Sequence, residues 1–272
     1  MASAAAIPET RASIRDDAVT VSAISLLAWM IASISHEGLG HALTALLTGT
    51  PSGVLSTMAW DSPYGATRLV ASAGTLVNLT EALVFWLALR GARKASPLTR
   101  LFLFAGCAFN LLTGSGYFFF SGVSNFGDWA QVVAGLHPHW MWMVLLTVTG
   151  AIAYYASLRA LGAALVRYMG IPREEKPRLK QLTWNLYFSV LVLSVAAGLM
   201  NPLGIKVVLE SAVAAAAGGN AGLLWLRYYV PRGTVPQRSG DGVARGYAWI
   251  AAAAVILVPY IFVLGRGITL HR

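Results

Sequence analysis

The chain has 272 residues, of which 57% are hydrophobic and only 11% are charged, and its mean hydropathy is +0.63. A soluble domain carries about 25% charged residues, so this chain has too few to cover a water-exposed globule. The composition therefore excludes an ordinary soluble protein and predicts an all-α, polytopic bundle of transmembrane helices.

The formal net charge is +9, but the basic residues lie in short segments between long uncharged stretches. Cations in such loops set membrane topology and contact anionic lipid headgroups. We therefore expect the lipid bilayer as a partner and no nucleic acid. The single cysteine, Cys107, excludes an intramolecular disulfide or a zinc site of several thiolates.

Residues 1–18 form a polar N-terminal tail, which we expect to be disordered or to lie on the membrane surface. The tail does not introduce a signal peptide, because the apolar stretch after it is too long. About 20 apolar residues are needed to cross a bilayer. Seven segments meet this length (within a range of six to eight): 19–47, 67–89, 98–120, 140–166, 182–200, 205–228 and 246–265. Only residues 201–204 separate the fifth from the sixth, which form either a tight hairpin or one broken element.

The loops between these segments alternate in charge. Loops two, four and six carry most of the basic residues: Arg90, Arg93, Lys94, Arg100, Arg173, Lys176, Arg178, Lys180, Arg227, Arg232, Arg238 and Arg245. Residues 48–66 and 121–139 contain no Lys or Arg. This pattern predicts a cytoplasmic N-terminus, and we expect a multi-pass protein of a bacterial inner membrane. Arg266 and Arg272 run against the pattern.

Three ionisable side chains lie close together in the first segment: His36, Glu37 and His41. One charge at the centre of a membrane helix costs roughly 2.5–3.5 kcal/mol, so such residues are candidates for a functional site. The alternative is that they lie near the membrane surface and bond to neighbouring groups.

These residues resemble the HExxH motif of zinc proteases, and their place in a first membrane span resembles the site-2 protease family of intramembrane metalloproteases. The resemblance covers residues 19–135, a three-span core, and leaves 136–272 as a four-span membrane region that resembles nothing. It implies Zn²⁺ bound by His36 and His41, with Glu37 as the general base. It also implies a transmembrane or juxtamembrane protein substrate.

The spacing between the two histidines is one residue longer than in HExxH. Five steps of a regular α-helix turn a side chain by about 140°, which separates the imidazoles. A π-bulge would absorb the extra residue, and Gly38 and Gly40 would ease it. The dipeptidyl peptidase III family, also zinc peptidases, has the longer spacing.

A site of this class needs a third protein ligand, and the resemblance implies an Asp from a later helix. Asp128 is the candidate, since it and Asp61 are the only acidic residues in the two loops without basic residues. The alternative is that Asp128 caps a helix that begins near Trp129. His137 and His139 lie in the same loop and are second-choice ligands.

The second segment contains Gly74 and Asn78, which resemble the Gly-x-x-x-Asn element of site-2 proteases. We expect Asn78 and Asn110 to support the site or bind substrate, while Glu81 is either catalytic or a partner for a polar group on another helix. Two other functions stay open: an inactive metal-binding scaffold, and a transporter whose polar residues line a path.

Overall fold

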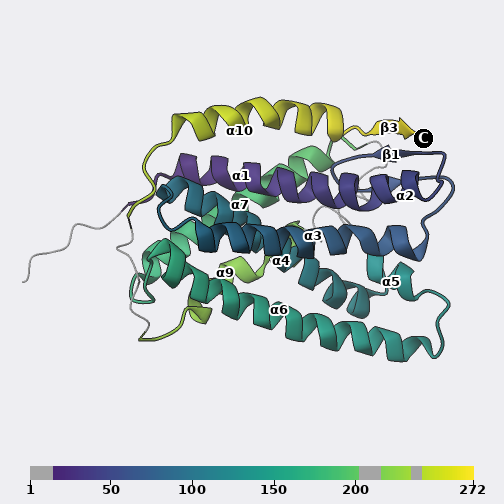
Figure 1. Cartoon of the computed structure of the whole chain (residues 1–272), viewed down its shortest axis with the longest axis horizontal. Helices are drawn as coiled ribbons and strands as arrows, with labels where there is room; N and C mark the ends of the chain where they lie inside the picture. Colours follow the sequence, from purple (N-terminus) through teal and green to yellow (C-terminus); the bar gives the residue numbers. More distant parts are fainter. Residues whose placement is uncertain (1–14, 202–215, 234–240) are drawn as a thin grey trace, which may run out of the picture.

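The structure is a computed structural model that describes residues 15–201, 216–233 and 241–272. Its helical elements are α1 (Ala18–Ile34), η1 (Ser35–Ala42), α2 (Leu43–Leu47), α3 (Arg68–Gly91), α4 (Pro97–Ser124), α5 (Asp128–Val133), α6 (His139–Met169), α7 (Lys176–Gly198), α9 (Gly222–Tyr229), α10 (Tyr247–Pro259) and η3 (Tyr260–Leu264). The all-α, polytopic architecture predicted from the sequence is confirmed (Figure 1).

Six helices among the described residues are long and apolar enough to cross a membrane: Ala18–Leu47, Arg68–Gly91, Pro97–Ser124, His139–Met169, Lys176–Gly198 and Tyr247–Leu264. They correspond to the first five predicted segments and the last. The first part of the predicted sixth segment, 205–228, falls on residues 202–215, which lie outside the described residues. Its described end contains α9.

Helix α4 lies in the middle of the bundle and packs against α1, α3 and α6. The buried side chains of Phe104 and Phe109 belong to the same hydrophobic core as Ile24 and Met30 of α1, and the ring of Phe109 contacts that of Trp29. Helices α10 and α6 lie at opposite edges in Figure 1, and both expose large apolar side chains. In a membrane protein such side chains contact lipid, so the bundle presents an apolar surface to the bilayer.

Local sequence signals explain where the main helices begin and end. Asp17, Thr67 and Ser96 each cap a helix by accepting a hydrogen bond from a backbone N–H of the first turn. Helices α4 and α6 end at Asn125 and Gly170, both in the left-handed conformation that stops a helix.

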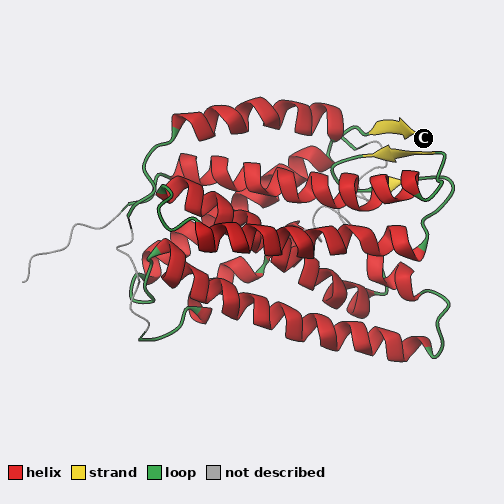
Figure 2. Ribbon diagram, viewed as in Figure 1, coloured by secondary structure: helices red, strands yellow, loops and turns green. Residues whose placement is uncertain are grey.

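Three short strands, β1 (Ser52–Leu55), β2 (Trp60–Asp61) and β3 (Ile268–His271), form an antiparallel sheet in the order β2-β1-β3. Figure 2 shows the sheet at one end of the bundle. The register pairs Val54 with both Asp61 and Thr269. No strand was predicted here from the sequence. The sheet matters for the site because β1 and β2 both contact η1.

Candidate metal centre

The first membrane span is not a regular α-helix where it carries the His-Glu cluster. Residues Ser35–Ala42 form the π-helix η1, which runs directly between α1 and α2. A π-helix bonds residue i to residue i+5, so residues five apart lie about one turn apart. The π-bulge predicted from the spacing is therefore confirmed, and it brings the rings of His36 and His41 to a centroid distance of 4.8 Å.

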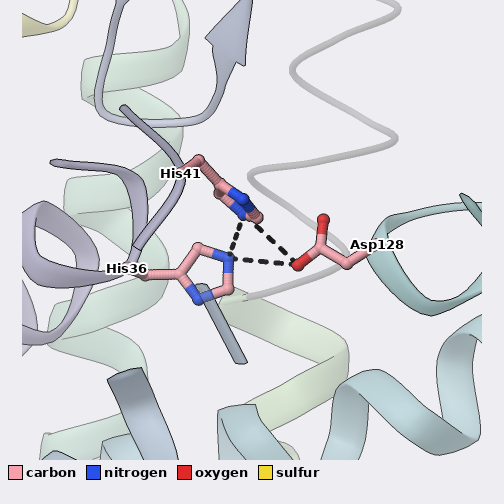
Figure 3. A group of neighbouring side chains, drawn as sticks. All are labelled: His36, His41 and Asp128. Atoms are coloured by element: carbon pink, nitrogen blue, oxygen red, sulfur yellow. Dashed lines mark hydrogen bonds and ion pairs between the residues drawn. The ribbon is translucent and has the colours of Figure 1, made fainter. Parts of the chain in front are cut away.

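Asp128 completes a group of three metal-ligating side chains. Its Oδ2 atom lies 3.4 Å from Nε2 of His36 and 3.4 Å from Nε2 of His41, and the two Nε2 atoms are 3.2 Å apart. Figure 3 shows the carboxylate facing both imidazoles. Helix α5 begins at Asp128 itself, its N-cap is Gly127, and no side chain caps it. Asp128 therefore points into the site and does not cap the helix.

The other nitrogen of each imidazole has a partner that fixes its proton. Nδ1 of His41 lies 2.7 Å from the backbone oxygen of Val70, and a carbonyl oxygen can only accept. Nδ1 of His41 must therefore donate, which leaves a lone pair on Nε2.

The proton of His36 is fixed through two buried amides. The side-chain nitrogen of Asn110 donates to the backbone oxygen of Gly106 at 3.0 Å, so its oxygen faces Asn78 and accepts from that amide at 2.6 Å. The Asn78 oxygen then faces Nδ1 of His36, which must donate to it. The Nε2 atom of His36 is again left with a lone pair. These contacts agree with the supporting role predicted for both asparagines.

Three electron-pair donors therefore face one another in a buried space. His36 is 4% exposed and His41 7%, and Oδ2 of Asp128 has no hydrogen-bond partner among the described residues. Such an arrangement is unfavourable unless a cation or an extra proton lies between the donors. His36, His41 and Asp128 could hold a metal ion.

The distances fit a tetrahedral ion. Bonds of about 2.0–2.1 Å to zinc give a tetrahedron with edges of about 3.3–3.4 Å, and the three donors are 3.2–3.4 Å apart. Two imidazoles and one carboxylate are also a donor set that zinc accepts, and they leave a fourth position open.

Asp128 lies outside the candidate spans, and its charge state suits a ligand. Burial would raise the pKa of its carboxyl group. Without a metal, an extra proton on the imidazoles gives them a positive charge, and their interaction with the carboxylate outweighs burial and holds its pKa well below its ordinary value. The side chain is therefore ionised, which is the form that binds a metal.

Two glycines allow η1 and α3 to approach closely enough to build this centre. A Cβ atom on Gly74 would lie 2.5 Å from Nε2 of His41 and 2.6 Å from Nε2 of His36. A Cβ on Gly40 would lie 2.5 Å from the Cα of Gly74. The lack of a side chain at Gly74 thus lets α3 lie directly against the ligands.

Glu37 lies beside the ligands without joining them. It is 7% exposed, and its Oε1 atom is 4.0 Å from Nε2 of His36. Its Oε2 atom accepts a hydrogen bond from the backbone N–H of Trp60 at 3.0 Å. Strand β2 therefore holds the carboxylate in place.

A large cavity opens at the centre. Its volume is about 920 Å³, and its lining includes Glu37, His41 and Asp128. The rest of the lining is largely aromatic and small residues of α4, α6 and α9, such as Phe120 and Tyr154. Glu37, His41 and Asp128 thus line a space whose other walls are mostly apolar and suit an apolar chain.

The remaining predicted residues lie elsewhere. His139 contacts Asn125 at 3.1 Å, and His137 is exposed in the loop before α6. Neither belongs to the metal-ligating group found among the described residues. Glu81 interacts with Ser35 and Asn110 behind the ligands, so it is a partner for polar groups on other helices.

Some contacts of the centre carried no signal in the sequence. The N–H of Trp60 and the carbonyl of Val70 belong to the backbone, which every residue shares. The ring of Tyr117 stacks on His36 at a centroid distance of 5.0 Å, yet in the sequence it is one of several aromatic residues in a membrane span.

Comparisons with protein-family models, curated proteins and solved structures found no match.

Proposed function

We propose that the chain is an intramembrane zinc peptidase that resembles site-2 proteases, with His36, His41 and Asp128 as ligands. The observation that carries this proposal is the convergence of three lone pairs at tetrahedral spacing beside a buried carboxylate. When bound, zinc would supply a Lewis acid and lower the pKa of water.

Glu37 is the general base in this proposal. It takes a proton from the attacking water and passes it to the nitrogen of the broken peptide bond. The N–H of Trp60 holds one oxygen of Glu37 at 3.0 Å, which leaves the other to face the water. A base on a rigid support needs no reorganisation during the reaction.

The substrate class follows from the cavity and from the apolar outer surface. Aromatic and small side chains line most of the space beside the ligands, and four of the six candidate spans contribute to its lining. We infer that a membrane-embedded or juxtamembrane segment of a protein substrate enters this space and exposes its backbone to Glu37.

Two features distinguish a peptidase from an inactive scaffold or a transporter: the need for Glu37 and the distribution of polar groups. An inactive scaffold would bind metal but would not need the base. A transporter would need polar side chains along a path, whereas Asn78 and Asn110 bond to each other and to His36. Asn185 bonds instead to Ser22 and to the carbonyl of Ala18.

The test is hydrolysis of a transmembrane peptide in liposomes by the wild type and by Glu37→Gln, with zinc measured in both. Glutamine can still accept from Trp60 but cannot act as a base. We expect the variant to retain zinc and to lose activity by about 10²–10⁴-fold. Equal rates in the two proteins, or a zinc-loaded wild type that cleaves no such peptide, would overturn the proposal.

A further inference from the structure

A second, much smaller cavity also has Glu37 in its lining. Its volume is about 40 Å³, and it shares Glu37, Met58, Thr113 and Tyr117 with the large cavity. Residues of α1, η1, α3, α4, α7 and η3 complete its lining. All of its lining residues except Tyr117 are buried. Glu37 is therefore one of four residues that line both a large apolar cavity and a small buried one.

Three hydroxyl groups of the small cavity are buried without a hydrogen-bond partner. They belong to Thr57, Thr113 and Ser194, which are 8%, 6% and 5% exposed. A buried hydroxyl that lacks a partner costs about 1–3 kcal/mol. Three such groups around one small space therefore destabilise the fold considerably, unless a molecule in the cavity forms hydrogen bonds with them.

Two other hydroxyl groups in the wall, those of Ser33 and Tyr260, form hydrogen bonds within the protein. The Ser33 hydroxyl donates to the backbone oxygen of Thr57 at 3.0 Å, and the Tyr260 hydroxyl donates to Ser33 at 3.0 Å. The backbone N–H of Thr57 donates to the carbonyl of Leu264 at 3.2 Å. These bonds tie α1, η3 and the β1–β2 connection together, so the three remaining hydroxyls cannot readily turn to new protein partners.

We infer that this cavity is a binding site for water. A water molecule needs about 10–15 Å³ and two to four polar partners, and the cavity offers about 40 Å³ and three free hydroxyls. It lies against Glu37 and His36. Its water would be held at the base while an apolar substrate fills the large cavity.

The role of this water rests on the proposed function, whereas its binding does not. Each peptide hydrolysis consumes one water: its oxygen bonds to the carbonyl carbon, the C–N bond breaks, and its two protons end on the new amine and carboxyl group. A membrane-embedded site has no bulk water at hand, so a store beside Glu37 would supply the co-reactant.

The test compares unfolding midpoints of the full-length protein in detergent for Thr57→Val and Ser194→Ala. The matched control is Thr75→Val. The Thr75 hydroxyl is also buried without a partner but lines neither cavity. Replacing a hydroxyl that has no partner by a group of similar shape is neutral or stabilising, and replacing one that holds water is destabilising.

We expect Thr75→Val to leave the midpoint unchanged or raise it, and the two cavity variants to lower it by about 2–4 °C. In the liposome assay, Thr57→Val should lower kcat several-fold with zinc content and KM unchanged. Midpoints of both cavity variants that match or exceed that of Thr75→Val would overturn the water site. If the wild type hydrolyses no peptide, only the proposed function is refuted. The unfolding midpoints would still show whether the cavity binds water.

Discussion

The contact between Gly74 and the two imidazoles allows a direct test of the metal centre. Replacing Gly74 by alanine adds a single methyl group, which would lie 2.5 Å from Nε2 of His41 and 2.6 Å from Nε2 of His36. Ordinary contacts of a Cβ atom begin at 3.4 Å. One or both imidazoles must therefore move by about 0.9 Å, or α3 must withdraw by as much.

A displacement of this size is large for a metal ligand, because bond lengths in such sites hold within about 0.2 Å. Loss of a supporting group behind a ligand weakens metal binding by about 10–100-fold, and here the ligands themselves move. We expect zinc affinity to fall by at least about 100-fold, or about 2.8 kcal/mol.

The assay is competition for zinc between the purified protein and a chromophoric chelator. Gly91→Ala is the matched control, because Gly91 lies in the same helix and no atom lies within 4 Å of its added Cβ. Gly91→Ala should bind zinc as the wild type does. Unchanged affinity in Gly74→Ala would refute the placement of the imidazoles against α3.

Three further predictions concern other parts of the fold. Asn110→Leu removes the group that orients Asn78. It should weaken zinc binding by about 10–100-fold in the same competition assay. An unchanged affinity would show that the two amides do not orient His36. Arg178→Met removes a 2.9 Å ion pair and leaves the charge of Asp16 buried without its partner. Chemical unfolding should show a loss of about 3–5 kcal/mol in stability, part of which returns when Asp16→Asn is added. Equal stability of the single and double variants would contradict this. Hydrogen bonds from Arg245 and Thr20 lower the pKa of Asp17 from 3.8 to about 2. The contribution of Asp17 to stability is therefore present above about pH 4 and is lost as the pH falls towards 2. The unfolding midpoint of Asp17→Asn should lack this part of the acid dependence, and identical acid profiles of the variant and the wild type would rule it out.

Hydropathy predicted most of the fold because the bilayer dictates how long an apolar helix must be. The spans around His36 and Asn78 appear where the apolar runs place them. A π-bulge was one way to bring His36 and His41 together despite the longer spacing, and the structure has a π-helix there. Asp128 was found because acidic residues are scarce in its part of the chain.

The sheet and the backbone contacts could not be predicted in the same way. Strand β3 has four residues and pairs with β1, more than 200 positions earlier in the chain, so no local pattern reveals it. The N–H of Trp60 reaches Glu37 only because β2 is held in that sheet. Contacts of this kind depend on tertiary packing and on groups that every residue carries.

The account depends most directly on the metal centre, so the decisive measurement is the zinc content of the detergent-purified protein. It should be compared with His36→Ala, His41→Ala and Asp128→Ala, and with His139→Ala as a control outside the centre. We predict one zinc per chain in the wild type and the control, and its loss in the other three variants. A wild type that binds no zinc even when zinc is supplied, or ligand variants that retain it, would contradict the account.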